Sequence, residues 1–132
     1  MVLGSGVMGH GIAQVSAAAG YPVVLRDIER RFLDKAMDKI RWSLEKMVSK
    51  GRISKEEGDA IFGRIIPVVD LKEAVRDADM VIEVVPEIME LKKKVHAELD
   101  GVADPRVIFA SNTSTLPITE IASSTSLSLI HI

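Results

Sequence analysis

Hydrophobic residues gather in short runs that alternate with longer segments in which they recur every three or four positions. Short apolar runs bounded by turn residues predict buried strands, and a spacing of three to four predicts helices with one apolar face. We expect strands at residues 2–3, 23–27, 65–69, 80–85 and 107–110. We expect helices at residues 8–19, 30–50, 71–76, 87–99 and 117–123. One more short helix, capped by Ser54, is expected to end near residue 63.

Strands and helices alternate in this scheme, except that two helices follow the second strand. The continuous apolar character of residues 80–85 is typical of a parallel strand covered on both faces. Pro67 limits the pairing of the third strand and places it near an edge of the sheet. The pattern predicts an α/β fold: a Rossmann-type, doubly wound parallel sheet with an inserted helical pair after the second strand.

The composition is that of a folded globular chain, with 47% hydrophobic and 27% charged residues. Lys and Arg total 17 against 19 Asp and Glu, a net charge of −2 that argues against general nucleic-acid binding. With no cysteine and three scattered histidines, we expect neither a disulfide framework nor a metal site. No apolar run approaches the roughly 20 residues that cross a bilayer, and we expect a cytoplasmic protein without membrane contact.

Three glycines at G-x-G-x-x-G spacing, Gly4, Gly6 and Gly9, stand between the first strand and the first helix. The first permits a tight turn, the second leaves room for a pyrophosphate, and the third lets helix and strand pack closely. Asp27 ends the second strand, where a carboxylate accepts ribose hydroxyls and repels a 2′-phosphate. This spacing favours NAD over NADP, although Arg26 argues the other way. A turn that binds no ligand is the alternative.

Two further polar segments follow predicted strands at their carboxyl ends. Glu87 comes just after the fourth strand, and Ser-Asn-Thr-Ser at 111–114 follows the fifth. Ligands of open parallel sheets bind at this edge, so both segments are candidates for a binding site. The alternatives are an acid in the first turn of a helix and ordinary loop polarity. Lys92 by itself is expected to be a solvated helix lysine, and His96 is expected to lie on a polar helix face.

The long helix at 30–50 carries a basic face. Four residues share one side of it: Lys39, Ser43, Lys46 and Lys50. Such a segregated face suits the phosphate groups of a ligand, and an ordinary solvated surface is the alternative. Trp42 points away from the apolar stripe of this helix, so we expect it to pack on another domain or a partner.

Several linked motifs resemble the 3-hydroxyacyl-CoA dehydrogenase family. They are the glycine turn with Met-Gly at 8–9, VIEVVPE at 81–87 and FASNTSTLPITEIA at 109–122. The resemblance runs from Val2 to about Ser126, with Val84 where the family usually has alanine. It implies the NAD-binding domain of an oxidoreductase that interconverts (S)-3-hydroxyacyl-CoA and 3-oxoacyl-CoA by hydride transfer in fatty-acid metabolism.

The resemblance also implies roles for individual residues. Cofactor contacts are implied for Gly4, Gly6, Val7, Met8, Gly9, Asp27, Glu87, Lys92, Asn112 and Ser114. Ser114 is similar to the family's serine that contacts both nicotinamide and the substrate's oxygen. Ser43 and Lys50 match the family's coenzyme A contacts, so the implied substrate is an acyl-CoA thioester.

The family's chemistry also needs a His–Glu pair and a C-terminal helical domain that closes the substrate cleft and forms a homodimer. Nothing in this sequence matches either part. We therefore expect residues 1–126 to be a dinucleotide-binding domain truncated at both ends and inactive alone. Residues 127–132 are expected to be non-native or disordered, and His131 is not expected to be catalytic. The alternatives are a dehydrogenase of free 3-hydroxy acids, such as L-gulonate, and a non-catalytic dinucleotide-binding or assembly module of a multifunctional protein.

Overall fold

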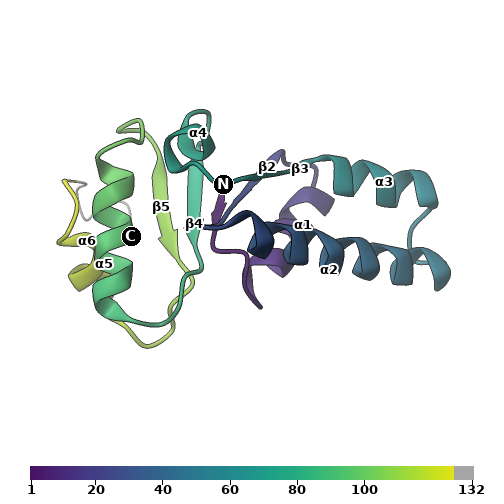
Figure 1. The fold of residues 1–132 in the computed structure, drawn as a ribbon, viewed down its shortest axis with the longest axis horizontal. Helices are drawn as coiled ribbons and strands as arrows, with labels where there is room; N and C mark the ends of the chain where they lie inside the picture. Colours follow the sequence, from purple (N-terminus) through teal and green to yellow (C-terminus); the bar gives the residue numbers. More distant parts are fainter. Residues whose placement is uncertain (127–132) are drawn as a thin grey trace.

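The computed structural model describes residues 1–126, in which a five-stranded sheet lies between two groups of helices (Figure 1). The strands are β1 (Val2–Leu3), β2 (Val23–Arg26), β3 (Ile65–Val68), β4 (Met80–Glu83) and β5 (Ile108–Ser111). All neighbours are parallel, in the order β3-β2-β1-β4-β5. The predicted parallel sheet is confirmed, and β3 with Pro67 lies at an edge. The predictions about 127–132, including His131, fall outside the described residues.

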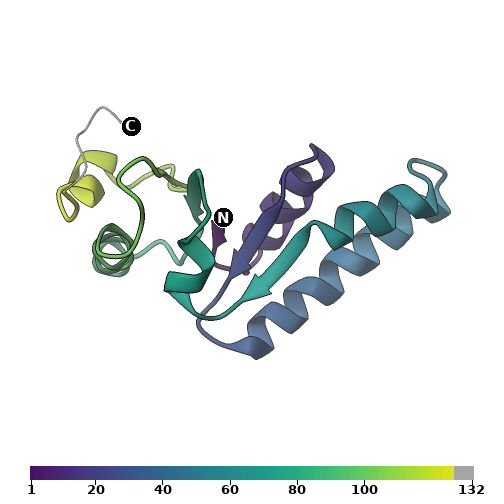
Figure 2. The same ribbon diagram turned by 90° about the horizontal axis from the view of Figure 1, so that it is seen from above.

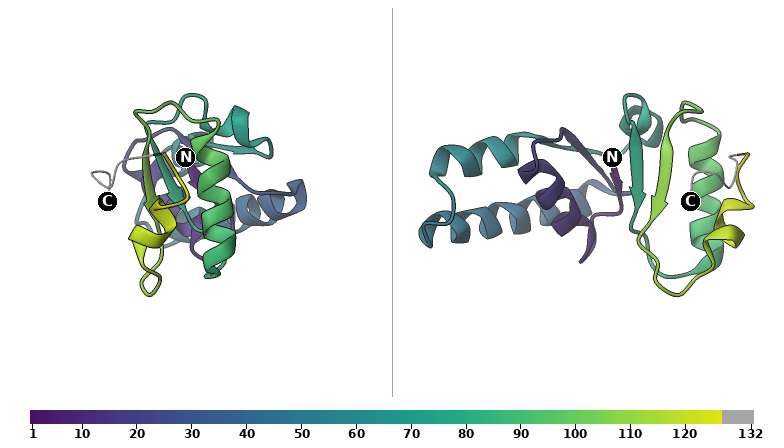
Figure 3. Two further views of the ribbon diagram at one scale, coloured as in Figure 1. Left: turned by 90° about the vertical axis from the view of Figure 1, so that its left-hand side faces the viewer. Right: turned by 180° about the vertical axis from the view of Figure 1, so that it is seen from behind.

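The helices are α1 (Gly9–Ala18), α2 (Arg30–Ser49), α3 (Lys55–Gly63), α4 (Leu71–Val75), α5 (Met89–Asp100) and α6 (Ile118–Ala122). Helices α2 and α3 run side by side as a long hairpin that extends away from the sheet (Figure 2). At the opposite end of the molecule, α5 lies next to β5 and α6 packs beside α5 (Figure 3). Within residues 1–126, none of these helices has both the length and the apolar character that a membrane span requires.

Strand β1 shows why helices cover both faces of the sheet. Successive side chains of a strand point to opposite faces. Val2 belongs to a buried cluster with Ala13 of α1 and Leu33 of α2, whereas Leu3 belongs to a second cluster with Leu99 of α5. The sheet therefore has a hydrophobic core on each face, which is the predicted doubly wound arrangement.

The strand order reverses at β1, because β2 and β3 lie on one side of it and β4 and β5 on the other. Leu3 pairs with both Arg26 and Glu83, so the carboxyl ends of the three central strands stop at the same level. Ligands of open parallel sheets bind at such a switch point, outside the carboxyl ends of the strands. We therefore expect a ligand to bind at the loops that follow β1, β2 and β4.

The segment after β4 differs from the expectation in two respects. Helix α5 begins at Met89, so Glu87 precedes the helix instead of lying in its first turn, because Ile88 is extended (φ −126°, ψ 115°). Lys92 and His96 are buried, at 1% and 4% exposure, where a solvated lysine and a polar helix face were predicted. The face of α5 that carries them, together with Val95 and Leu99, points inward, and the His96 ring packs edge-on against a phenylalanine of β5.

Candidate functional site

A cavity of about 700 Å³ opens at the carboxyl ends of β1, β2 and β4. Its size falls in the range of small-molecule and cofactor sites. Among the residues predicted to bind the cofactor, those that line it are Gly4, Gly6, Val7, Met8, Asp27, Glu87 and Asn112. Segments that are far apart in the sequence therefore meet at one concave surface.

The glycine turn forms one wall of this cavity, and each of its three glycines serves a different structural purpose. Gly4 adopts a φ of 106°, and a Cβ there would lie 2.7 Å from the carbonyl oxygen of Val84. A Cβ on Gly9 would lie 1.8 Å from the carbonyl oxygen of Gly4, so only glycine lets α1 start this close to β1. Around Gly6 no atom lies within 4 Å of the Cβ position, which leaves open space. The turn therefore contains two glycines that allow close packing, Gly4 and Gly9, and one, Gly6, that leaves room for a ligand to approach.

Helix α1 begins at Gly9, directly behind this turn. The first N–H groups of a helix lack intrahelical acceptors, and its N-terminus carries a partial positive charge. No acidic side chain lies in the first turn of α1 to offset that charge. The turn can therefore receive an anionic group such as a pyrophosphate.

Asp27 lies at the end of β2, and the glycine turn holds its carboxylate. Asp27 Oδ2 accepts hydrogen bonds from the backbone N–H of Ser5 at 2.8 Å and from the Ser5 hydroxyl at 2.6 Å. Its Oδ1 accepts from the backbone N–H of Ile28 at 2.7 Å. A carboxylate offers about four acceptor positions, so the remaining capacity is on Oδ1. Asp27 is thus oriented to accept a ligand hydroxyl through that oxygen.

Arg26, the residue that argued for NADP, also lines the cavity. Its Nε donates to the carbonyl oxygen of Val69 at 3.1 Å, beyond the edge strand β3. This bond directs the Nε of Arg26 toward the segment after β3, whereas both oxygens of Asp27 are held by the glycine turn and by Ile28. The carboxylate is therefore the better oriented of the two charges.

The opposite wall, at the ends of β4 and β5, contains a buried ion pair. The Lys92 Nζ lies 2.8 Å and 3.0 Å from the two carboxylate oxygens of Glu83, and the two side chains are 1% and 0% exposed. Glu83 also accepts from the backbone N–H of Val85 at 2.7 Å and from the Ser111 hydroxyl at 2.6 Å. This pair connects the end of β4, the end of β5 and helix α5.

Glu87 lies at the rim above this pair. Its carboxylate accepts hydrogen bonds from the hydroxyls of Thr113 and Thr115, the latter at 3.0 Å, and lies 3.3 Å from the Lys92 Nζ. The Thr113 hydroxyl is the main cause that holds the pKa of the Glu87 carboxyl below its usual value, with Thr115 and Lys92 acting in the same direction. Glu87 is therefore an anion that fastens the 111–115 loop to the segment after β4.

Three of the predicted cofactor residues do not line the cavity. Gly9 lies beneath the turn as a packing residue, Lys92 lies beneath Glu87, and Ser114 is exposed in the loop after β5. Five polar residues of this region had no separate role in the sequence analysis: Ser5, Glu83, Ser111, Thr113 and Thr115. A signal for Glu83 was present, because a lone acid inside the apolar run 80–85 must be paired when that strand is buried.

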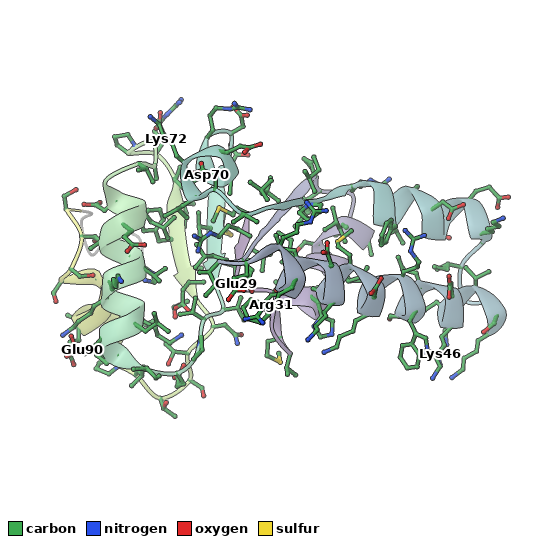
Figure 4. The ribbon with its side chains drawn as sticks, viewed as in Figure 1. Glu29, Arg31, Lys46, Asp70, Lys72 and Glu90 are labelled. Carbon is green, nitrogen blue, oxygen red and sulfur yellow. The ribbon has the colours of Figure 1, made fainter. Side chains whose placement is uncertain are left out.

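The basic face of α2 begins at the cavity and continues along the helix. Lys39 lines the cavity, whereas Ser43 and Lys50 lie farther along. Figure 4 shows Lys46 projecting from α2 on the side away from α3. The Lys46 Nζ lies 3.8 Å from the centroid of the Trp42 ring, and Trp42 is 59% exposed. Among residues 1–126, the ion pairs of α2 involve only its N-terminal arginines, which leaves this face positively charged.

The switch-point cavity, the glycine turn behind it and the oriented carboxylate define a dinucleotide-binding domain of the doubly wound α/β class. Residues 1–128 match the family described as 3-hydroxyacyl-CoA dehydrogenase, NAD binding domain. The chain belongs to this family.

Individual relatives agree with this assignment. The chain is 41% identical over 121 residues to 3-hydroxyadipyl-CoA dehydrogenase of Escherichia coli (strain K12), covering 92% of this chain and 25% of that protein. It is 43% identical over 121 residues to fatty acid oxidation complex subunit alpha of Idiomarina loihiensis, covering 92% of this chain and 17% of that protein. The chain thus spans a quarter or less of the length of these two relatives.

Solved structures show the same fold. The crystal structure of 3-hydroxybutyryl-CoA dehydrogenase from Escherichia coli K12 superposes with a TM-score of 0.91 at 38% identity. That superposition covers 96% of this chain and 27% of the other. The match covers nearly all of this chain, so the fold and the family assignment support each other.

Proposed function

We propose that this chain is the part of a 3-hydroxyacyl-CoA dehydrogenase that binds NAD, in an enzyme that interconverts (S)-3-hydroxyacyl-CoA and 3-oxoacyl-CoA. The observation that carries the proposal is the meeting of Gly6, with open space at its Cβ position, and the oriented carboxylate of Asp27 in one cavity. The two residues fit the pyrophosphate and the ribose of a dinucleotide. NAD, when bound, supplies the hydride acceptor for C3 of the hydroxyacyl group.

The residues of this chain bind the dinucleotide and orient it. The turn at Gly6 and the N-terminus of α1 receive the pyrophosphate, and Asp27 receives the adenosine ribose while opposing a 2′-phosphate. Glu87 and Asn112 lie at the other end of the cavity, where the nicotinamide belongs. Ser114 is proposed to reach the substrate's oxygen from the loop after β5. We assign the removal of the proton from the substrate hydroxyl to a His–Glu pair outside residues 1–126. This chain alone is therefore expected to bind the cofactor without turnover.

The first experiment is a titration of the chain with NADH and with NADPH, followed by the fluorescence of the nicotinamide. We expect NADH to bind at least about tenfold more tightly, because a 2′-phosphate would meet the Asp27 carboxylate. Equal affinity for the two dinucleotides, or no binding by a chain whose circular dichroism shows it folded, would overturn the proposal.

For the substrate, we propose an acyl-CoA thioester in preference to a free 3-hydroxy acid. The basic face of α2 supports this choice, because a free acid lacks the phosphates that such a face attracts. The chain has one tryptophan, Trp42, whose ring lies 3.8 Å from the Lys46 Nζ of this face, so its fluorescence reports binding there directly. Coenzyme A should change that signal and Lys50→Glu should weaken the effect, whereas Lys72→Glu on α4 should not. No response to coenzyme A, together with reduction of free 3-oxo acids by the whole protein, would favour the free acid.

For the whole protein, we propose a cytoplasmic homodimer formed through a C-terminal helical domain. The family resemblance and the share of each relative that lies outside the match support this arrangement. The net charge of −2 supports the absence of nucleic-acid binding. Sedimentation of the whole protein beside this chain tests the dimer: a dimeric whole protein and a monomeric chain are expected, and a monomeric whole protein would contradict it.

A further inference from the structure

The glycine turn has one position, Gly6, at which the backbone is both open to a ligand and weakly restrained. No atom lies within 4 Å of the Cβ position of Gly6, so a ligand has room to approach. A glycine also has more backbone freedom to lose on folding than any other residue. The feature that admits a ligand therefore leaves the peptide group between Gly6 and Val7 loosely held, unless another group restrains it.

The His10 side chain supplies such a restraint from the first turn of α1. Its Nδ1 lies 2.6 Å from the carbonyl oxygen of Gly6. The backbone nitrogen of His10 lies 3.4 Å from the same oxygen, beyond the usual range of about 2.7–3.2 Å for an N–H donor. The imidazole is therefore the closer partner of the Gly6 carbonyl group.

The chemistry of the two groups fixes where the hydrogen of this bond lies. A carbonyl oxygen only accepts hydrogen bonds, so the Nδ1 of His10 must carry the hydrogen. A neutral ring in the Nδ1–H form and a doubly protonated ring both meet this condition. The His10 side chain is half-buried and is absent from the lining of the cavity, so it holds the turn from behind the cavity wall.

This bond sets the direction of the next backbone N–H group. In a planar trans peptide, the carbonyl group and the N–H that follows it point in opposite directions, and the peptide between Gly6 and Val7 is trans. Because the Gly6 carbonyl points toward α1, the Val7 N–H points away from α1, and Val7 itself lines the cavity. Among residues 1–126 the Val7 N–H has no acceptor. It is therefore a donor that a ligand in the cavity can use.

We propose that His10 is a positioning residue, which holds the peptide group between Gly6 and Val7 so that the Val7 N–H faces an anionic oxygen of the dinucleotide. The imidazole acts through the backbone and does not itself contact the cofactor. This inference rests on the proposed NAD site, because the ligand group that it concerns is the pyrophosphate at the glycine turn.

Two substitutions of His10 test the positioning role, with NADH affinity measured by calorimetry and the unfolding midpoint by circular dichroism. His10→Ala removes the bond to Gly6, and NADH binding should weaken about three- to tenfold. His10→Asn places an amide N–H where the Nδ1–H of histidine stood, and NADH binding should stay within about twofold of wild type. Val15→Ala, at a position of the same helix that is 65% exposed, is the control and should leave NADH affinity unchanged.

Other roles of His10 predict different results. If its imidazole contacted the cofactor directly, His10→Asn and His10→Ala would weaken NADH binding equally. If it served stability alone, His10→Ala would lower the unfolding midpoint and leave NADH affinity unchanged. Either result overturns the proposal.

A measurement without cofactor keeps this inference distinct from the proposed function. In nitrogen-15 nuclear magnetic resonance spectra of the free chain at alkaline pH, the ring of His10 should be in its Nδ1–H form, and His10→Asn identifies its signals. His96 is an internal reference, because its Nδ1 lies 2.9 Å from the carbonyl oxygen of Lys92 and requires the same form. The amide signal of Val7 should move in His10→Ala and stay in place in Val15→Ala.

These spectra separate the two possible failures. If wild-type chain binds no NADH, the proposed function fails, whereas the Nδ1–H form of His10 and the shift of the Val7 amide still support its hold on the turn. If NADH binds and His10 is in the Nε2–H form, or the Val7 amide signal does not move, the positioning role fails and the proposed function stands.

Discussion

The two walls of the cavity are built on different principles. The wall at β1, α1 and β2 consists of backbone from the glycine turn and one carboxylate, Asp27, held by short local hydrogen bonds. The wall at β4 and β5 consists of loops that a buried ion pair holds in place. The first wall depends on glycine positions that have no side chain, and the second depends on buried side chains. The two walls should therefore fail in different ways when they are altered.

The largest effect is expected at the first wall, from Gly9→Ala. A Cβ at position 9 would lie 1.8 Å from the carbonyl oxygen of Gly4, so α1 must move away from β1. We expect the free energy of unfolding to fall by about 3 kcal/mol or more, measured by urea denaturation. Gly11→Ala, in the same helix with no atom within 4 Å of the new Cβ, is the matched control. It should be neutral or stabilising by up to about 1 kcal/mol, and equal losses for both variants would contradict the packing role of Gly9.

Asp27→Asn should change the choice of cofactor more than the fold. Removing the charge weakens the bond to the ribose and the repulsion of a 2′-phosphate together. We expect NADH affinity to fall about ten- to a hundredfold and NADPH affinity to fall less, so the preference largely disappears. Asp34→Asn, an exposed aspartate that pairs with Arg30 on α2, should leave both affinities unchanged. If Asp27→Asn still prefers NADH over NADPH as strongly as wild type does, another group recognises the ribose.

Ser5→Ala should have a smaller effect of the same kind. The Ser5 hydroxyl donates to Asp27 at 2.6 Å, while the backbone N–H of Ser5 still donates in the variant. Losing one hydrogen bond should lower the ratio of NADH to NADPH affinity about three- to tenfold, measured by parallel titrations. Ser123→Ala on the far side of the molecule is the control, since within residues 1–126 its hydroxyl donates only to the carbonyl oxygen of Glu120. A ratio equal to that of wild type would mean that the two backbone amides suffice to orient Asp27.

The smallest expected effect belongs to the second wall and depends on pH. Because hydrogen bonds from Thr113 and Thr115 lower the pKa of Glu87 in the folded chain, its carboxylate stabilises the fold above the unfolded-state pKa of about 4.3. This contribution is lost as the pH falls through the lower folded-state value. Wild type should therefore lose stability relative to Glu87→Gln below about pH 4, with a constant difference above pH 5. Thermal unfolding of both proteins across this range tests the claim, and parallel curves would exclude it.

Most of the fold and the first wall could be predicted from the sequence, because their determinants are local. The apolar runs place all five strands, and the spacing from Gly9 to Asp27 identifies two points that the βαβ unit must bring together. Helix ends were equally local: Ser54, predicted as a cap, accepts the backbone N–H of Glu57 at 3.1 Å. Such features depend on a few neighbouring residues and a known backbone geometry.

The second wall could not be predicted in the same way, because its determinants are long-range. Lys92 and His96 look like solvent-facing residues in the helical pattern, and only the packing of α5 buries them. The partner of Ser111 is Glu83, 28 positions away on the neighbouring strand. The register between β4 and β5, which pairs these two residues, is fixed by the sheet and not by either segment alone. The acid inside an apolar strand was the one visible sign.

The proposed site requires that NAD bind with its pyrophosphate at the glycine turn. The most direct test is the set of backbone amide shifts of the isotope-labelled chain during titration with NAD. We expect the largest shifts at residues 6–9, with further shifts at Asp27 and Asn112 and none on α3. Shifts centred on the basic face of α2, with residues 6–9 unmoved, would contradict it.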